Sequence, residues 1–236
     1  MSAIFCFTLT VPRSIIYIQW IIIMPITKPF DHHYDEYEQW FVENRYVYLS
    51  EIAAVRHFMP TMGMGVEIGV GSGQFSLPLK IPFGIDPSTN MLKLAQQKRI
   101  RVAKAVAEHL PLKNTVFDSV LMVTTICFVD DVNIAFQEVR RILKTNGKFI
   151  LGLVDRNSPL GQIYQAKKQQ NVFYRLATFY SIEEIISLLE QNEFNNIQTV
   201  QTVFGSLAEI KAIQSFKKGY GEGGFVVIKA EVQTKI

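Results

Sequence analysis

The stretch VEIGVGSG at residues 66–73 is the most informative part of this 236-residue sequence. It begins as a short apolar run, which predicts a buried strand, and it ends in three closely spaced glycines, Gly69, Gly71 and Gly73. Glycines directly after a strand allow a tight turn and let a ligand approach the main chain. In open α/β sheets, ligands bind at the carboxyl ends of the strands. The stretch therefore predicts the first strand of an α/β fold with a ligand site beside it.

Strand and helix patterns alternate downstream of this stretch, from residue 66 to about residue 190. Short apolar runs predict further strands at about 81–85, 100–105, 119–124, 148–154, 197–204 and 224–231. The last two have no good helical pattern between them, which indicates an antiparallel finish. We expect an α/β, Rossmann-like doubly wound sheet of seven strands, mostly parallel with one antiparallel edge strand, and helices on both faces.

Capping residues predict where several of the intervening helices begin. Ser88 and Asp131 precede helical patterns, and Ser181 with Glu184 forms a capping box. The helix that starts at Asp131 is expected to end at Asn146-Gly147. Pro78 leaves room for only one or two helical turns after the glycine loop.

Two carboxylates narrow the choice of ligand. Glu67 lies two positions before Gly69, where it would repel a pyrophosphate and attract a cation. Asp86 ends the second predicted strand, 17 residues after Gly69, and can accept hydrogen bonds from both hydroxyls of a ribose. Gly73 comes one residue earlier than the third glycine of a dinucleotide fingerprint. The implied ligand has a ribose, a positive charge and no phosphates, which S-adenosylmethionine fits.

These residues resemble the class I S-adenosylmethionine-dependent methyltransferases. The glycine loop is followed by GIDPS at 84–88, AEHLPL at 107–112, FDSV at 117–120 and RRILKTNGK at 140–148. Together they look like the ubiquinone/menaquinone-type (methyltransferase type 11) subgroup, over about residues 61–155. Several motifs in this order, at strand ends, make the resemblance specific. It implies transfer of a methyl group from S-adenosyl-L-methionine to a small-molecule acceptor by in-line displacement, with S-adenosyl-L-homocysteine as product.

The resemblance also carries over the family's cofactor contacts by position. It implies that the methionine end of the cofactor is lined by Glu67, Gly69, Gly71 and Gly73, that Asp86 binds the ribose, and that Pro87, Ser88, Ala107, Glu108 and Thr124 complete the site. One position departs from the family pattern, because Val106 stands where many members have an acidic residue. The adenine amino group must then bond to backbone, water or Glu108.

The methyl acceptor is expected where the fourth and fifth strands end. Thr124 follows the fourth strand, Asp155 follows the fifth, and Tyr34 belongs to an aromatic helical stretch that could fold over the site or simply pack. These three residues are the candidates near the acceptor. No catalytic base is assigned, because methyl transfer needs one only when the nucleophile must lose a proton.

The chain divides into three parts at the sequence level. Residues 1–23 are apolar with a single charge, and we interpret them as a non-native or upstream extension before a start at Met24; an N-terminal membrane anchor is the alternative. Residues 24–60 are expected to form a helical lid. Residues 61–236 form the predicted methyltransferase domain, with a lid insertion at 156–178.

Composition excludes several other classes. The net charge is +3, from 24 basic and 21 acidic residues, and no run of five basic residues occurs, so no nucleic-acid partner is expected. Two cysteines cannot form a disulfide framework, and no Cys/His zinc pattern is present, so we expect a cytoplasmic protein without a metal. No membrane partner is expected unless residues 1–23 are an anchor, and the oligomeric state is left open.

Two alternative functions stay open on the sequence. One is an NAD(P)-dependent oxidoreductase on a similar sheet, against which the early third glycine and Glu67 count. The other is a non-catalytic S-adenosylmethionine-binding protein that acts as a regulatory or partner subunit.

Overall fold

The computed structural model describes residues 27–232, and residues 1–23, interpreted above as an extension, lie outside them. The eight strands form one sheet in the order β3-β2-β1-β4-β5-β8-β6-β7. Their bounds are Gly65–Ile68 (β1), Phe83–Asp86 (β2), Arg101–Lys104 (β3), Phe117–Val123 (β4), Leu143–Val154 (β5), Phe194–Thr202 (β6), Lys217–Lys218 (β7) and Phe225–Val232 (β8).

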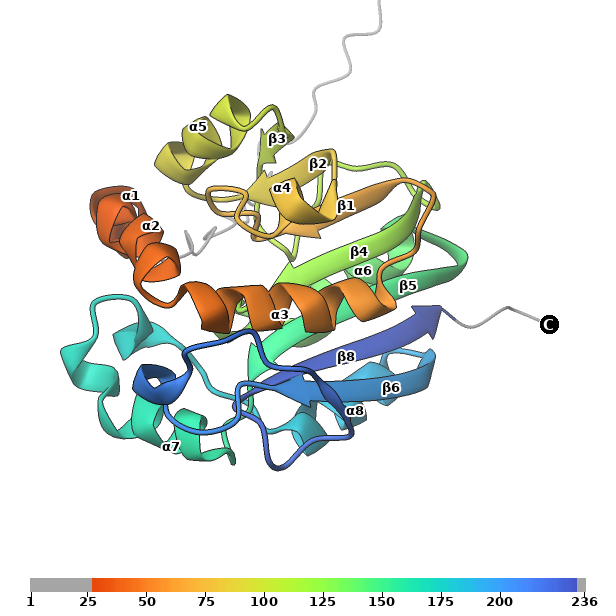
Figure 1. The fold of residues 1–236 in the computed structure, drawn as a ribbon. Helices are drawn as coiled ribbons and strands as arrows, with labels where there is room; N and C mark the ends of the chain where they lie inside the picture. Colours follow the sequence, from red (N-terminus) through yellow and green to blue (C-terminus); the bar gives the residue numbers. More distant parts are fainter. Residues whose placement is uncertain (1–26, 233–236) are drawn as a thin grey trace, which may run out of the picture.

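The sheet confirms the expected Rossmann-like α/β fold. Strands β1 to β5 pair in parallel, and β8 runs antiparallel to both β5 and β6 (Figure 1). Two details differ from the expectation. The two-residue strand β7 brings the number of strands to eight, and β8 lies between β5 and β6 rather than at the edge.

Helices cover both faces of this sheet. The α-helices are α1 (Lys28–His32), α2 (Tyr34–Glu43), α3 (Arg45–Phe58), α4 (Ser76–Leu79), α5 (Thr89–Gln97), α6 (Val132–Ile142), α7 (Pro159–Ala166) and α8 (Ile182–Gln191), with 3-10 turns at Ile126–Phe128, Lys168–Gln170, Tyr174–Leu176 and Leu207–Glu209. Alternate residues of β4 point to opposite faces, as the period of a strand requires. Val120 and Met122 pack in the cluster with α6 and α8, whereas Leu121 and Val123 pack in the cluster with α3. None of the helices within residues 27–232 is long and apolar enough to cross a membrane.

The predicted helix starts are confirmed. The side chains of Ser88, Asp131 and Ser181 each accept a hydrogen bond from the first turn of the following helix, and Ser181 forms the capping box with Glu184. Helix α4 has only four residues and contains Pro78.

The predicted end of α6 is wrong. The helix ends at Ile142, four residues before Asn146, because Leu143 is already extended and pairs with Phe117 at the start of β4. A local helix-stop signal is overridden here by sheet pairing.

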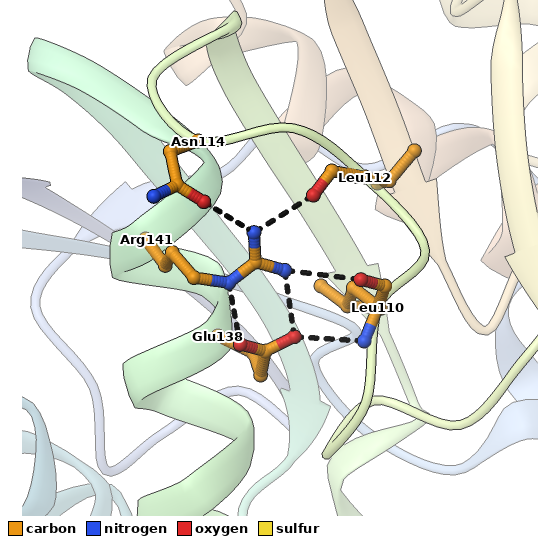
Figure 2. A network of polar contacts seen from close by, with 5 residues as sticks. All are labelled: Leu110, Leu112, Asn114, Glu138 and Arg141. Atoms are coloured by element: carbon orange, nitrogen blue, oxygen red, sulfur yellow. Dashed lines mark hydrogen bonds and ion pairs between the residues drawn. The ribbon is translucent and has the colours of Figure 1, made fainter. Parts of the chain in front are cut away.

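The loop between β3 and β4 is fixed by one guanidinium group (Figure 2). Arg141 on α6 donates to the carbonyl oxygens of Leu110 (3.0 Å) and Leu112 (2.7 Å) and to the side chain of Asn114 (2.6 Å). It also binds both oxygens of Glu138, whose Oε2 accepts from the Leu110 amide at 2.8 Å. The hydrogen bond from Arg141 lowers the pKa of Glu138. All five guanidinium donors are thus used to hold the loop that returns to the ligand site.

Candidate functional site

A cavity of about 640 Å³ opens at the carboxyl ends of β1, β2 and β4. Its size is within the range of small-molecule and cofactor sites. Residues of α1, α2 and α3 line one side, and residues between 154 and 178 line another. Figure 1 shows α1, α2 and the segment around α7 at the end of the sheet toward which β4 points. The cavity therefore lies where the doubly wound topology places ligands.

The glycine loop forms the floor of this cavity from main-chain atoms. Gly69 has a φ of +73°, and its amide donates to the carbonyl of Ile85 on β2 at 2.8 Å. A Cβ at this position would collide with Thr125. Gly71 has a φ of +51°, and a Cβ there would meet the hydroxyl of Tyr37 at 3.1 Å. Both glycines are needed for the turn and for the close approach of the covering side chains.

Asp86 is held by the backbone at the end of β2. Its Oδ2 accepts from the Gly71 amide and its Oδ1 from the Ser88 amide, both at 2.8 Å. Burial raises the pKa of Asp86 to about 6, although the two backbone hydrogen bonds act in the opposite direction. Each oxygen still has lone pairs for a further donor. The carboxylate is therefore oriented and can accept two hydroxyl groups of a ligand.

The opposite wall comes from the segments after β3 and β4. Ala107, Glu108 and Thr124 line the cavity. The Oε1 atom of Glu108 accepts from the amides of Asp130 (2.7 Å) and Asp131 (3.2 Å), which ties the wall to the start of α6.

The structure brings most of the sequence-predicted site residues together. Those that line the cavity are Gly69, Gly71, Asp86, Pro87, Ser88, Ala107, Glu108 and Thr124. Their contacts with a cofactor stay predictions.

Four predicted residues do not line the cavity. Glu67 is buried and accepts from the hydroxyl of Ser76 at 2.5 Å, and burial raises its pKa to about 8. Gly73 packs against α5 and the residues after it instead. The Asp155 carboxylate accepts from the Asn157 amide at 3.1 Å, inside the turn before α7, and Tyr34 is on the exposed side of α2.

Helices α1 to α3 are bound to the glycine loop and to the start of α5. Glu38 accepts from Ser72 and from Gln74 (2.8 Å). Asp31 accepts from the hydroxyl of Ser88 at 2.6 Å. The hydroxyl of Tyr48 donates to the carbonyl oxygen of Gln74 at 2.5 Å, which adds a tie from α3. The helices thus cover the loop in a fixed position.

A second group of lining residues, the aromatic half of the cavity, consists mainly of aromatic side chains, among them Trp40, Phe41, Tyr164, Phe173 and Tyr174. Tyr164 and Tyr174 stack with ring centroids 5.1 Å apart. Burial raises the pKa of each, so both remain neutral phenols. Glu51 on α3 lines the same space and is only 7% exposed.

Glu51, Tyr164 and Tyr174 are not among the site residues predicted from the sequence. One signal was available for Glu51, because it is an acidic residue four positions from Val47 and from Val55, on the apolar face of a helix. The tyrosines gave no comparable signal.

The acidic and basic side chains of the lining are all carboxylic acids. They are Glu36, Glu51, Asp86, Glu108 and Asp130, and the described part of the chain contributes no Lys, Arg or His to the lining. A site of this kind favours a cationic ligand and disfavours an anionic one.

Comparison with known proteins gives consistent matches. The family model for the methyltransferase domain of type 11 matches residues 66–151. An uncharacterized protein of Methanocaldococcus jannaschii is 43% identical over 202 residues, covering 86% of this chain and 98% of its own. The malonyl-[acyl-carrier protein] O-methyltransferase of Geobacter sulfurreducens is 33% identical over 99 residues, which cover 37% of each protein.

A solved structure extends this similarity to nearly the whole fold. It is a SAM-dependent methyltransferase of Thermotoga maritima, described as a possible histamine N-methyltransferase. It is 48% identical, covers 86% of this chain and 98% of its own, and superposes with a TM-score of 0.84.

Proposed function

The chain belongs to the class I S-adenosylmethionine-dependent methyltransferases of type 11, and from this we propose that it methylates a small-molecule acceptor by in-line displacement inside the cavity described above. The observation that carries the proposal is that the predicted cofactor residues and the aromatic residues line the same cavity. One cavity is lined both by the oriented Asp86 carboxylate with the glycine loop and by a group of aromatic side chains.

The residues present fit the cofactor. Its ribose needs paired hydroxyl acceptors, and Asp86 keeps free lone pairs on both oxygens. Its sulfonium and ammonium groups need a site without cations, and the described lining is acidic. The glycine loop presents main-chain atoms to the cavity, and a Cβ at Gly69 or Gly71 would meet the side chain of Thr125 or Tyr37. When bound, S-adenosylmethionine supplies the methyl group and leaves as S-adenosylhomocysteine.

The contribution of the chain to this reaction is orientation and exclusion of water. Asp86 and the backbone of the glycine loop would fix the nucleoside, while the tied helices α1 to α3 cover the loop. Alignment of two reactants can contribute about 7–11 kcal/mol of barrier reduction. Thr124 lines the cavity after β4 and is the sequence-predicted acceptor candidate that we retain.

The relatives suggest which acceptors to test first. The Thermotoga protein is described as a possible methyltransferase of histamine, which is an amine, and the Geobacter protein acts on a malonyl group. The acidic lining supports the first class, because a carboxylate substrate would enter this cavity without a counter-charge.

Titration calorimetry with S-adenosylhomocysteine, S-adenosylmethionine and NADH tests the cofactor assignment. We expect micromolar binding of the two sulfur nucleotides and no binding of NADH. Tight binding of NADH would favour the oxidoreductase alternative. Binding of S-adenosylhomocysteine without methyl transfer to any of a broad set of amines, phenols, thiols and carboxylates would favour the non-catalytic alternative.

A further inference from the structure

Glu51 is a buried carboxyl group that the cofactor site does not use. It lies on α3, is only 7% exposed and lines the aromatic half of the cavity. Within residues 27–232 it has no hydrogen-bond or ion-pair partner. Other buried carboxyl groups of the chain have partners: Glu67 binds Ser76, and Asp86 binds two backbone amides. A buried carboxyl group without a partner is costly, unless a ligand supplies one.

The surroundings of Glu51 suit a cation. Burial, and to a smaller extent the charge of Glu51, raises the pKa values of Tyr48, Tyr164 and Tyr174, and the last two line the same cavity as Glu51. Trp40 and Phe41 line the same compartment. Aromatic faces attract cations, most strongly where water is excluded. The hydroxyl groups of Tyr164 and Tyr174 have no hydrogen-bond partner among the described residues and can accept from an ammonium group.

We propose that Glu51 binds the ammonium group of an amine acceptor and takes a proton from its nitrogen before methyl transfer. The inference rests on the proposed function and specifies its acceptor class: an amine that is protonated at neutral pH and attached to an apolar or aromatic body. Glu51 is then a catalytic residue, because it touches the reacting atom.

The step is balanced in atoms and electrons. An N–H bond of the ammonium breaks, an O–H bond forms on Glu51, and the electron pair stays on nitrogen. That pair forms the new bond to the methyl carbon while the carbon–sulfur bond breaks and leaves its pair on sulfur. The positive charge of the sulfonium reappears on the methylated nitrogen. Glu51 keeps this proton when the product leaves, because the free carboxyl group is protonated at pH 7; the one proton that the reaction yields is released to water when the amine binds.

Electrostatics supports this assignment. Burial raises the pKa of Glu51 to about 8, which is close to the pH at which a base must work. An approaching ammonium favours the carboxylate form. At pH 7 the free carboxyl group holds a proton and so does the free amine. The complex holds one proton fewer, whether that proton resides on nitrogen or on oxygen.

Calorimetry on the complex with S-adenosylhomocysteine tests the inference without turnover. The probes are 2-phenylethylamine, 2-phenylethanol and phenylacetate, which share a ring and differ in charge. The proteins are the wild type, Glu51→Gln, and Glu43→Gln as a matched control, since Glu43 is exposed on α2 and bonds only to Gln39. Proton exchange is obtained from titrations in two buffers of different ionisation enthalpy at pH 7.

We expect 2-phenylethylamine to bind the wild type and Glu43→Gln equally, with release of about one proton per amine bound. In Glu51→Gln the affinity for the amine falls at least tenfold and the proton release disappears, while the affinity for S-adenosylhomocysteine stays within twofold. Phenylacetate binds to none of the three proteins.

Unchanged amine affinity in Glu51→Gln, or binding of phenylacetate as tight as that of the amine, overturns the inference. Failure of the wild type to bind S-adenosylhomocysteine would instead count against the proposed function itself. If Glu51→Gln does not fold, proton release by the wild type decides alone: about one proton supports the role of Glu51, and none contradicts it.

Discussion

The two halves of the cavity are built in different ways. The half around Asp86 consists of main-chain atoms of the glycine loop and of a carboxylate whose two oxygens are already bonded to backbone amides. The half around Glu51 consists of side chains from α2, α3 and the segment 154–178, and its acidic group has no partner in the described residues. The first half is specified by strand-end geometry, which many sequences share. The second is specified by individual side chains, which can differ between relatives that bind the same cofactor.

A glycine substitution should break the main-chain half most severely. In Gly69→Ala the new Cβ collides with Thr125 and the backbone must keep a φ of +73°. We expect no measurable binding of S-adenosylhomocysteine and a melting temperature lower by roughly 5–15 °C. Gly219→Ala is the matched control, because Gly219 has a φ of +85° and the Cβ that alanine adds there has no atom within 4 Å. It should lower stability only slightly and leave affinity unchanged. Calorimetry and thermal unfolding measure both, and normal affinity in Gly69→Ala would contradict the account of the loop.

Removal of the Asp86 carboxylate should affect the cofactor and not the acceptor compartment. Asp86→Ala deletes two acceptors for the ribose hydroxyls, each worth about 1.5–3 kcal/mol as a charged hydrogen bond. We expect at least 100-fold weaker binding of S-adenosylhomocysteine, measured by calorimetry, with the sheet intact by circular dichroism. Asp118→Ala is the control, since Asp118 bonds to Met64 and Lys144 away from the cavity. Equal affinity in Asp86→Ala and Asp118→Ala would mean that the ribose does not contact Asp86.

Acidification should weaken the same contact. The cofactor binds the carboxylate form, and the pKa of Asp86 in the free protein is about 6. Affinity for S-adenosylhomocysteine should therefore be constant above about pH 7 and fall about tenfold between about pH 7 and pH 5. Glu67, whose pKa is about 8, is already protonated over this range and cannot cause the change. Calorimetry at several pH values checks the profile, and the same fall in Asp86→Ala would assign it to another group.

The smallest of these effects is expected in the side-chain half. Tyr164→Leu keeps an apolar side chain but removes a ring from the face of the compartment, where a cation–π contact contributes about 0.5–2 kcal/mol. We expect the KM of an amine acceptor to rise about threefold to tenfold while affinity for S-adenosylhomocysteine stays within twofold. Tyr46→Leu is the control, because Tyr46 is 44% exposed and does not line the cavity. A loss of cofactor affinity in Tyr164→Leu would show that the two halves are not separate.

The same contrast explains how much could be predicted from the sequence. Ser88, Asp131 and Ser181 each accept from an amide three residues away, so each helix start is a local property that the sequence displays. The prediction for the end of α6 is wrong because Leu143 pairs with Phe117, which lies 26 residues away in the sequence. A short-range pattern does not contain that contact.

The residues of the candidate site also differ in whether a short-range sequence pattern predicts them. Gly69, Gly71 and Asp86 are recognised by their spacing after predicted strands, and the structure places all three at the cavity. Glu51 and Tyr174 are more than 100 residues apart and meet only after the sheet has formed. The spacing of each residue to its sequence neighbours does not indicate that the two line the same compartment.

The position of β8 has a consequence for how the chain reaches this fold. β8 is the last of the described strands in chain order, yet it lies between β5 and β6 and pairs with both. During synthesis from the N-terminus, β5 and β6 therefore exist as two open strand edges until residues 225–232 emerge. The nascent sheet is exposed to mispairing for longest at this point, and closure of the sheet is a late, long-range event.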